Sequence, residues 1–468
     1  MATIISSNRR TPCSIIHRWP LVTGSKLPAY TPRRMPAPSS LKRAATIPSV
    51  DINLRCPGHS KNGPQQGGSA QAKGEIQMLL RKFLLPCMIA GVLANAVAAP
   101  EDEEVEAINR APESEIVIGQ SVPTTGIAAD TGKALALGAS LYFGRVNARG
   151  GINGAVINHK VMDDGNDPQK AIQNTRDLLD KQGALMLVNY YGTATVDALT
   201  RSKVLANANV ALVGVHAGAD LIRLPGDPNI FQTRAGYTQE LEKTVQLLTG
   251  NLGITRVGAL VQNDADGQAA LKSLKDALTK RQLKLEIEAS FDAKSGNVTA
   301  ATAKLAKANP QAVIVLAISK PAAAFVKQYK AAGGTSQLYG ISLIQFEDVI
   351  RIVGKKDAHG LGISQVYPYP ANMQLRFIRE FQEDAGAVLR SGEYPSYAVL
   401  EGYIAARLAT EAIKRAGKAP TRAAAYAALA TLTRLDLGGY VIDFGANKRL
   451  GSNFVELTMI APTGTLTR

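Results

Sequence analysis

The stretch NARGGING, residues 147–154, carries three glycines in eight positions and is a candidate phosphate-binding loop. Such a loop follows a strand and opens a helix, because the helix N-terminus presents free N–H groups and a favourable dipole to an anion. Here a predicted helix comes before the stretch and a predicted strand comes after it. We therefore interpret the glycines as helix-stop and turn residues.

Other enzyme motifs are missing from the sequence. After the first predicted strand, Ile116–Gly119, the chain reads QSVPTTG, which does not match the dinucleotide-binding pattern. The sequence also contains neither a P-loop nor a G-x-S-x-G motif. These observations predict no catalytic residues, no cofactor and no enzymatic activity.

Histidine and aspartate side chains give no clear catalytic or metal site. His159, His216 and His359 lie outside the N-terminal region and share no metal-ligand spacing. His159 falls inside a predicted strand, whereas His216 follows one and is a pocket candidate. Asp163, Asp164 and Asp167 could form a carboxylate pair, but turn and capping chemistry explains them more simply. We therefore predict that no metal is bound.

Short apolar runs alternate with amphipathic stretches from residue 115 onward in two successive series, which predicts two α/β lobes with parallel sheets and helices on both faces. The predicted elements include helices at 168–182, 195–207 and 238–249 and a strand at 283–289. In such sheets ligands bind beyond the carboxyl ends of the strands. The residues at these positions are mostly hydroxyls, amides and glycines, and few of them could act as a general base. They lie in 121–126, 190–195, 215–218, 263–267, 318–320 and 342–345.

The excess of positive charge and all of the cysteines are concentrated near the N-terminus. The formal charge of the 468-residue chain is +15, but residues 1–98 hold thirteen Lys and Arg against two acidic residues. The remaining residues carry 40 basic and 36 acidic groups, so the basicity does not indicate nucleic-acid binding by the body. All three cysteines, Cys13, Cys56 and Cys87, also precede residue 98. The body therefore has neither a disulfide framework nor a thiol nucleophile.

Residues 78–98 have the pattern of a secretory signal peptide. Arg81 and Lys82 are followed by an apolar run and by Ala96-Val97-Ala98, an A-x-A cleavage site. The run to Ala99 is 17 residues and contains Pro86, which makes it short for a membrane span. We expect residues 1–77 to be a disordered basic leader, either an over-extended start or a transit peptide. An acidic linker is expected at 99–114.

The body resembles the type 1 periplasmic solute-binding proteins of ATP-driven importers, in the leucine/isoleucine/valine-binding branch. The likeness lies in a long stretch from IGQSVPTTGIAADTG to NARGGINGAVINHKVMDDGNDPQKA and in several shorter ones: YYGTATVDAL, ALVGVHAGADLIR, IFQTRAGYTQE, VQNDADGQAAL, ISQVYPYP and YAVLEGYIAARLATEAI. It covers about 115–465. It implies two Rossmann-like lobes joined by a three-segment hinge, with 115–235 plus 365–435 as the N-terminal lobe and 236–364 plus 436–468 as the C-terminal lobe.

The resemblance also implies a ligand site between the lobes, in which a ligand carboxylate lies on N–H groups and hydroxyls at a helix N-terminus. Thr193 and Thr195 match the family's serine/threonine pair, and Gly218 stands where the family often has threonine. Asp266 replaces a cleft tyrosine, and Ser342 falls near the acidic residue that commonly holds the ligand ammonium. Asp264 or Asp266 could supply that charge. The complete candidate set is Tyr191, Gly192, Thr193, Thr195, His216, Ala217, Gly218, Asp264, Asp266, Ser319 and Ser342.

The implied function is binding of an amino acid, of branched-chain type by default, or of a similar small polar molecule. The lobes would close on the ligand and deliver it to an inner-membrane ABC permease. We expect a monomeric periplasmic protein without nucleic-acid partners. A ligand-sensing receptor domain and, less favoured, a secreted α/β enzyme remain alternatives at this point.

Overall fold

The computed structural model describes residues 114–390, 394–445 and 448–468. The first lobe is built on a five-stranded parallel sheet in the order β2-β1-β3-β4-β5. Central strand β3 is buried along its whole length, as expected of a parallel strand covered on both faces. The strands are β1 (Glu115–Val122), β2 (Val156–Asp163), β3 (Met186–Tyr191), β4 (Leu212–His216) and β5 (Ile230–Phe231).

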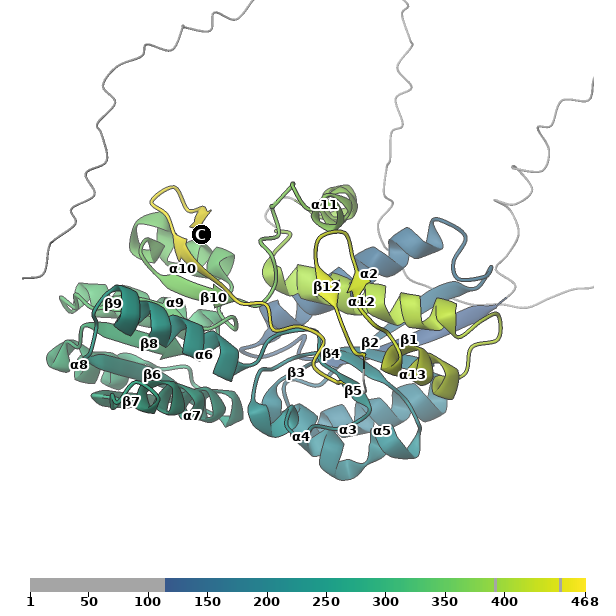
Figure 1. Ribbon diagram of the computed structural model, residues 1–468, viewed down its shortest axis with the longest axis horizontal. Coiled ribbons are helices and arrows are strands. Elements are labelled where there is room, and N and C mark those ends of the chain that lie inside the picture. The colour runs from purple at the N-terminus through teal and green to yellow at the C-terminus, as the bar shows by residue number, and fades with distance from the viewer. Residues whose placement is uncertain (1–113, 391–393, 446–447) are drawn as a thin grey trace, which may run out of the picture. The chain divides into compact units, whose positions relative to one another are not determined.

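Helices cover both faces of this sheet (Figure 1). On one face lie α3 (Pro168–Arg176), α4 (Thr193–Ser202) and α5 (Val204–Asn207), and the short turn η2 (Asp220–Ile222) contacts α4. On the other face lie α2 (Ala129–Asn147), α12 (Tyr397–Arg415) and α13 (Arg422–Ala430), while α11 (Arg376–Val388) packs against α2. The last three of these helices come from the chain after its return from the second lobe.

The second lobe contains a seven-stranded sheet in the order β14-β13-β10-β9-β8-β6-β7. Five strands are parallel, and β13 and β14 add an antiparallel edge. The strands are β6 (Val257–Asn263), β7 (Ile287–Asp292), β8 (Ala312–Leu316), β9 (Gln337–Gly340), β10 (Gly362–Gln365), β13 (Glu456–Ile460) and β14 (Leu466–Thr467). The helices are α6 (Tyr237–Gln246), α7 (Ala265–Thr279), α8 (Thr299–Ala308), α9 (Ser319–Ala331) and α10 (Phe346–Ala358).

Three segments of chain join the lobes, after β5, after β10 and before β13. The third carries a small hairpin of β11 (Leu435–Asp436) and β12 (Val441–Ile442). Beyond it, Phe444 packs on Phe231 of the first lobe at 5.2 Å between ring centroids, and Leu450 bridges to Gln232. These contacts hold this part of the chain against the first lobe. We therefore propose that the chain passes into the second lobe for the last time near Ser452 rather than at residue 436.

Several predicted elements differ from the structure in their bounds. The helix expected at 195–207 begins at Thr193, because Gly192 takes a positive φ of 85° at its start, and it breaks at Lys203. The helices expected at 168–182 and 238–249 end in π-helical turns, η1 (Asp177–Lys181) and η3 (Leu247–Asn251). The strand expected at 283–289 begins only at Ile287.

The turn interpretation of NARGGING is confirmed. Helix α2 ends at Asn147, and the Gly151 N–H donates to the Val146 carbonyl at 3.0 Å, which closes the helix end. Gly150, Gly151 and Gly154 all have positive φ.

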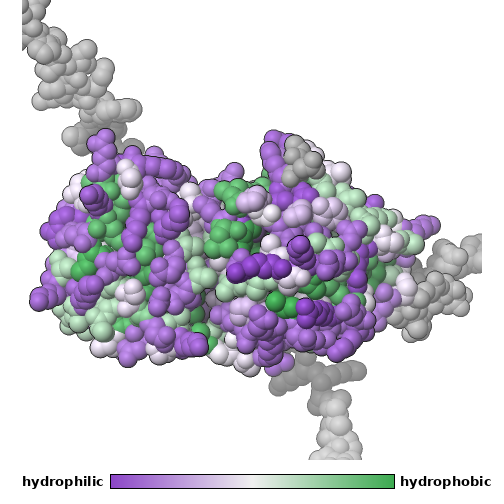
Figure 2. Space-filling view, turned by 90° about the horizontal axis from the view of Figure 1, so that it is seen from below, coloured by the Kyte–Doolittle hydropathy of each residue, from purple (hydrophilic) through white to green (hydrophobic). Residues whose placement is uncertain are grey.

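Apolar side chains fill the interior of both lobes, and polar side chains dominate the face seen in Figure 2. Within the described ranges, none of the helices is both long and apolar enough to cross a membrane. The expected leader, signal peptide and nearly all of the acidic linker lie outside the described residues.

Candidate functional site

A cavity of about 680 Å³ lies between the lobes at the carboxyl ends of their strands. The first lobe contributes residues at or just beyond the ends of β2 and β3, including Asn166 and Tyr191. The second lobe contributes residues at or just beyond the ends of β6, β7 and β8, including Asp264, Asp292 and Ile318. This is the place where parallel α/β sheets bind ligands, so the fold positions the cavity as the candidate site.

The N-terminus of α4 forms one wall of the cleft and is joined to the opposite lobe by Asp266. The Thr193 N–H donates to Asp266 Oδ2 at 3.0 Å, and the Thr193 hydroxyl donates to Asp266 Oδ1 at 2.5 Å. The Tyr237 hydroxyl donates to the same Oδ1 at 2.6 Å. A helix N-terminus stabilises a carboxylate through its free N–H groups and dipole. Here that carboxylate belongs to the chain itself.

Acidic side chains dominate the ionisable groups around the cavity. The lining contains Asp167, Asp264, Asp266 and Asp292 against the single cation Lys294. Burial, and next the charge of Asp266, raise the pKa of Asp264, which also caps α7 by accepting from the Gly267 N–H at 2.8 Å. The Ser295 N–H, followed by the Ser295 hydroxyl, lowers the pKa of Asp292. The site therefore has an excess of negative charge.

Tyr191 provides an aromatic surface beside these carboxylates. Its side chain is 5% exposed, lines the cavity and stacks on the His216 ring at 5.4 Å between centroids. Burial, with smaller contributions from the Asp266 and Asp264 charges, raises the pKa of the Tyr191 phenol, so it stays neutral. Among the described residues its hydroxyl has no hydrogen-bond partner.

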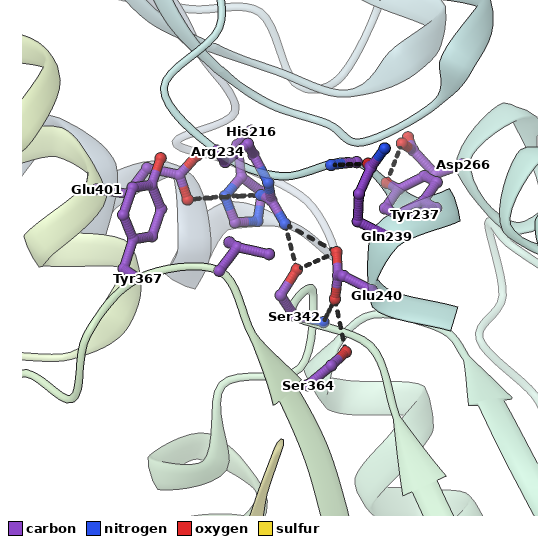
Figure 3. A network of polar contacts seen from close by, with 12 residues as sticks. His216, Arg234, Tyr237, Gln239, Glu240, Asp266, Ser342, Ser364, Tyr367 and Glu401 are labelled. Atoms are coloured by element: carbon purple, nitrogen blue, oxygen red, sulfur yellow. Dashed lines mark hydrogen bonds and ion pairs between the residues drawn. The ribbon is translucent and has the colours of Figure 1, made fainter. Parts of the chain in front are cut away.

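Behind the cleft, a buried ionic network centred on Arg234 connects the two lobes (Figure 3). Arg234 is fully buried in the segment between β5 and α6. Its Nη1 lies 3.5 Å from Glu401 Oε2 of α12, and its Nη2 lies 3.7 Å from Glu240 Oε1 of α6. His216 Nδ1 lies 2.8 Å from Glu401 Oε2 and 3.2 Å from Arg234 Nη1.

The two carboxylates of the network are held differently. Burial raises the pKa of Glu240, although Arg234 and three hydrogen bonds oppose the shift. These bonds come from the Ser342 N–H at 2.9 Å, the Ser342 hydroxyl at 2.8 Å and the Ser364 hydroxyl at 2.6 Å. The pKa of Glu401 is lowered, because the effects of His216 and Arg234 outweigh its burial. Arg234 thus neutralises a buried acid from each lobe.

The structure brings part of the predicted site to the cavity. Tyr191, Asp264 and Asp266 line it, and Gly192 and Thr193 adjoin Asp266. Thr195 is buried next to them, and its hydroxyl has no partner among the described residues.

The other predicted residues lie away from the lining. Ser342 and His216 belong to the Arg234 network, and the Ser319 hydroxyl accepts from the Gln345 N–H at 3.0 Å. Ala217 is fully buried, and the Gly218 carbonyl accepts from the Tyr237 N–H at 2.8 Å. A Cβ at Gly218 would meet the Tyr237 ring at 2.6 Å, so a threonine does not fit there.

Sequence reasoning missed Arg234, Glu240 and Glu401, and it also missed Tyr237 and Asp292. The stretch IFQTRAGYTQE contained three of these residues, but no strand end marked them as candidates. Glu401 lies in an apolar helix, AVLEGYIAARLA, where a lone acid is a signal of a buried partner. In the described part of the chain, no group of three or more His, Cys, Asp or Glu side chains is arranged to hold a metal ion.

Comparison with known proteins agrees with this geometry. The model of a periplasmic binding protein family matches residues 115–460. A substrate-binding periplasmic protein from Ralstonia solanacearum is 37% identical, with a TM-score of 0.72 over 75% of this chain and 99% of that one. An extracellular ligand-binding receptor from Verminephrobacter eiseniae is 27% identical, with a TM-score of 0.71 over 76% and 100% of the two chains.

More distant relatives carry ligand names. An amino acid binding protein from Pseudomonas aeruginosa is 23% identical over 248 residues, which is 53% of this chain and only 64% of that protein's length. A branched-chain amino acid ABC transporter protein from Thermus thermophilus, solved with valine, shares the fold at 19% identity and a TM-score of 0.69, over 76% and 95% of the two chains.

Two α/β lobes with a cavity at their facing strand ends have the architecture of periplasmic binding proteins. The chain belongs to the periplasmic binding protein family, type 1, as the matched residues 115–460 show.

Proposed function

We propose that the protein is the substrate-binding component of an ABC importer, and that it acts in the periplasm as a monomer. It holds an amino acid or a similar small polar molecule in the interlobe cavity and delivers it to an inner-membrane permease. The observation that carries this proposal is the 680 Å³ cavity, which is lined by strand-end residues of both lobes. The amino-acid names of the Pseudomonas and Thermus relatives support the ligand class.

The mechanism is binding with lobe closure. A ligand that contacts Tyr191 on one wall and Asp264 on the other makes both sets of contacts only when the lobes approach, so it favours the approached state. The Thr193–Asp266 hydrogen bonds also join the two lobes and therefore stabilise the same approached state. The closed form is the one that we propose docks on the permease.

Thermal melting of the full chain against amino acids, amides, amines and small acids tests the proposal. A true ligand at 100 times its dissociation constant should stabilise the protein by about 2.7 kcal/mol. A melting shift from at least one compound is expected. If none of the panel shifts the melting temperature at millimolar concentration, the small-molecule-binding role is contradicted.

A further inference from the structure

We propose that the cleft selects an organic cation, and that Asp266 takes the place at the start of α4 that a ligand carboxylate would otherwise take. The ligand class is a primary amine without a free carboxylate, such as an aliphatic amine or an amino-acid amide. This inference rests on the proposed function, since it names the substrate class of the same cavity.

The first step concerns the anion-binding groups of α4. The Thr193 N–H and hydroxyl both donate to Asp266, and the Tyr237 hydroxyl donates to it as well. A ligand carboxylate placed on these donors would lie directly against the Asp266 carboxylate. Like charges at that separation repel, so the second anion is disfavoured.

The second step concerns the charge of the whole lining. Asp264 and Asp266 lie two residues apart at the start of α7, the first as its N-cap and the second in its first turn, and Asp167 and Asp292 line the same cavity. Lys294 is the single cation of the lining. After the Ser295 hydrogen bonds, its charge makes a smaller contribution to the lowered pKa of Asp292. Four aspartates against one lysine leave the cavity with a formal charge of minus three. A positively charged ligand gains from this field, and an anionic one loses.

The third step is Tyr191, which is independent of the acidic residues. The side chain is 5% exposed and lines the cavity, and its hydroxyl is without a hydrogen-bond partner among the described residues. A neutral phenol oxygen can accept a hydrogen bond from an ammonium group. Because no side chain or backbone group of the described residues occupies this oxygen, it is available to a ligand in the cavity.

The remaining lining suits an uncharged aliphatic portion of the ligand. Ile127 and Ile318 face the cavity from the two lobes, together with Pro168 and Ala194. The ligand would thus place its ammonium near Tyr191 and the Asp264–Asp266 pair, and its aliphatic part along these apolar side chains.

Three probes of similar size separate the charge classes: leucinamide, a cation; leucine, a zwitterion; and 4-methylpentanoate, an anion. Calorimetric titration of the full chain should give leucinamide a dissociation constant at least tenfold below that of leucine, with no measurable binding of 4-methylpentanoate. Tighter binding of leucine or of 4-methylpentanoate than of leucinamide would overturn the cation inference and leave the small-molecule-binding role intact. No binding of any probe, together with no melting shift from the broader panel, would overturn both.

The variant Asp266→Asn tests the role of this residue. It keeps an acceptor for Thr193 but removes the negative charge, so the preference for leucinamide over leucine should fall at least tenfold. Asp180→Asn is the matched control, because it removes the same charge from an exposed position in η1 and should leave the preference unchanged. An unchanged preference in Asp266→Asn would overturn the assignment of Asp266. If that variant does not fold, the order of the three probes with the wild-type chain decides the inference.

Discussion

At the scale of single residues, Arg234 has the largest predicted effect on stability. Its guanidinium lies between a buried carboxylate of each lobe, Glu240 and Glu401, and all three side chains are at most 2% exposed. A buried ion pair adds little net stability by itself, but removal of one partner leaves charges buried without compensation. The network therefore makes the hinge region intolerant of substitution.

We expect Arg234→Met to lower the free energy of unfolding by about 3–5 kcal/mol, because it leaves two buried acids unpaired. Arg201→Met is the control: Arg201 pairs with Asp197 on the surface, and such pairs contribute about 1 kcal/mol or less. Urea denaturation measures both. A loss below about 1 kcal/mol in Arg234→Met would show that the network does not hold the lobes together.

Glu347, at the start of α10, gives a pH dependence. Burial, and next the charge of Asp348, raise its pKa to about 8, and its Oε2 has no hydrogen-bond partner among the described residues. The pKa of Glu347 is higher in the folded state than its unfolded value of 4.5, so the side chain is neutral in both states below pH 4.5 and costs no stability there. As the pH rises from 4.5 to 8, the unfolded state loses the proton more readily, and the free energy of unfolding falls progressively.

Glu347→Gln should accordingly match the wild type near pH 4 and exceed its stability by about 1–2 kcal/mol above pH 8, a value reduced for the partial exposure of the side chain. Glu383→Gln removes a charge from an exposed site and should show no such trend. Urea denaturation across pH 4–9 measures the difference. A constant difference at all pH values would contradict the assignment.

At the scale of elements, α2 and α12 are held close together by glycine. A Cβ on Gly138 would lie 1.8 Å from the Val399 carbonyl oxygen, and a Cβ on Gly402 would lie 2.0 Å from the Leu135 carbonyl oxygen. The two backbones therefore meet where neither helix has a side chain. This contact fixes α12 against the first sheet, and α12 in turn carries Glu401 to Arg234.

Gly138→Ala should destabilise the protein by about 3 kcal/mol or more, because the added methyl forces the two helices apart. Gly144→Ala on the same helix is the matched control. Its added Cβ meets nothing within 4 Å, so helix propensity should make it neutral or stabilising by up to about 1 kcal/mol. Thermal unfolding of the two variants compares them directly, and equal effects would contradict the close helix contact.

At the scale of the whole molecule, hydrophobic periodicity was enough to predict two α/β lobes with strand-end ligand positions. It located Tyr191, Asp264 and Asp266, because parallel strands end at one edge of a sheet. It could not find the buried ionic network of Arg234. Along the chain Arg234 lies 6 residues from Glu240 and 167 residues from Glu401, and the three side chains meet only in the folded protein. Nor could it show that Thr193 donates to Asp266, because that pair joins two lobes.

The central claim is that a small molecule binds in the interlobe cavity, and a steric block tests it most directly. Ala194 is exposed at the first turn of α4 and lines the cavity, so Ala194→Trp fills the site without disturbing the core. Ala300→Trp places the same side chain on an exposed position of α8 that does not line the cavity. Calorimetric titration with the tightest compound of the melting panel should show binding to the wild type and to Ala300→Trp and none to Ala194→Trp. Unchanged binding to Ala194→Trp would contradict the account.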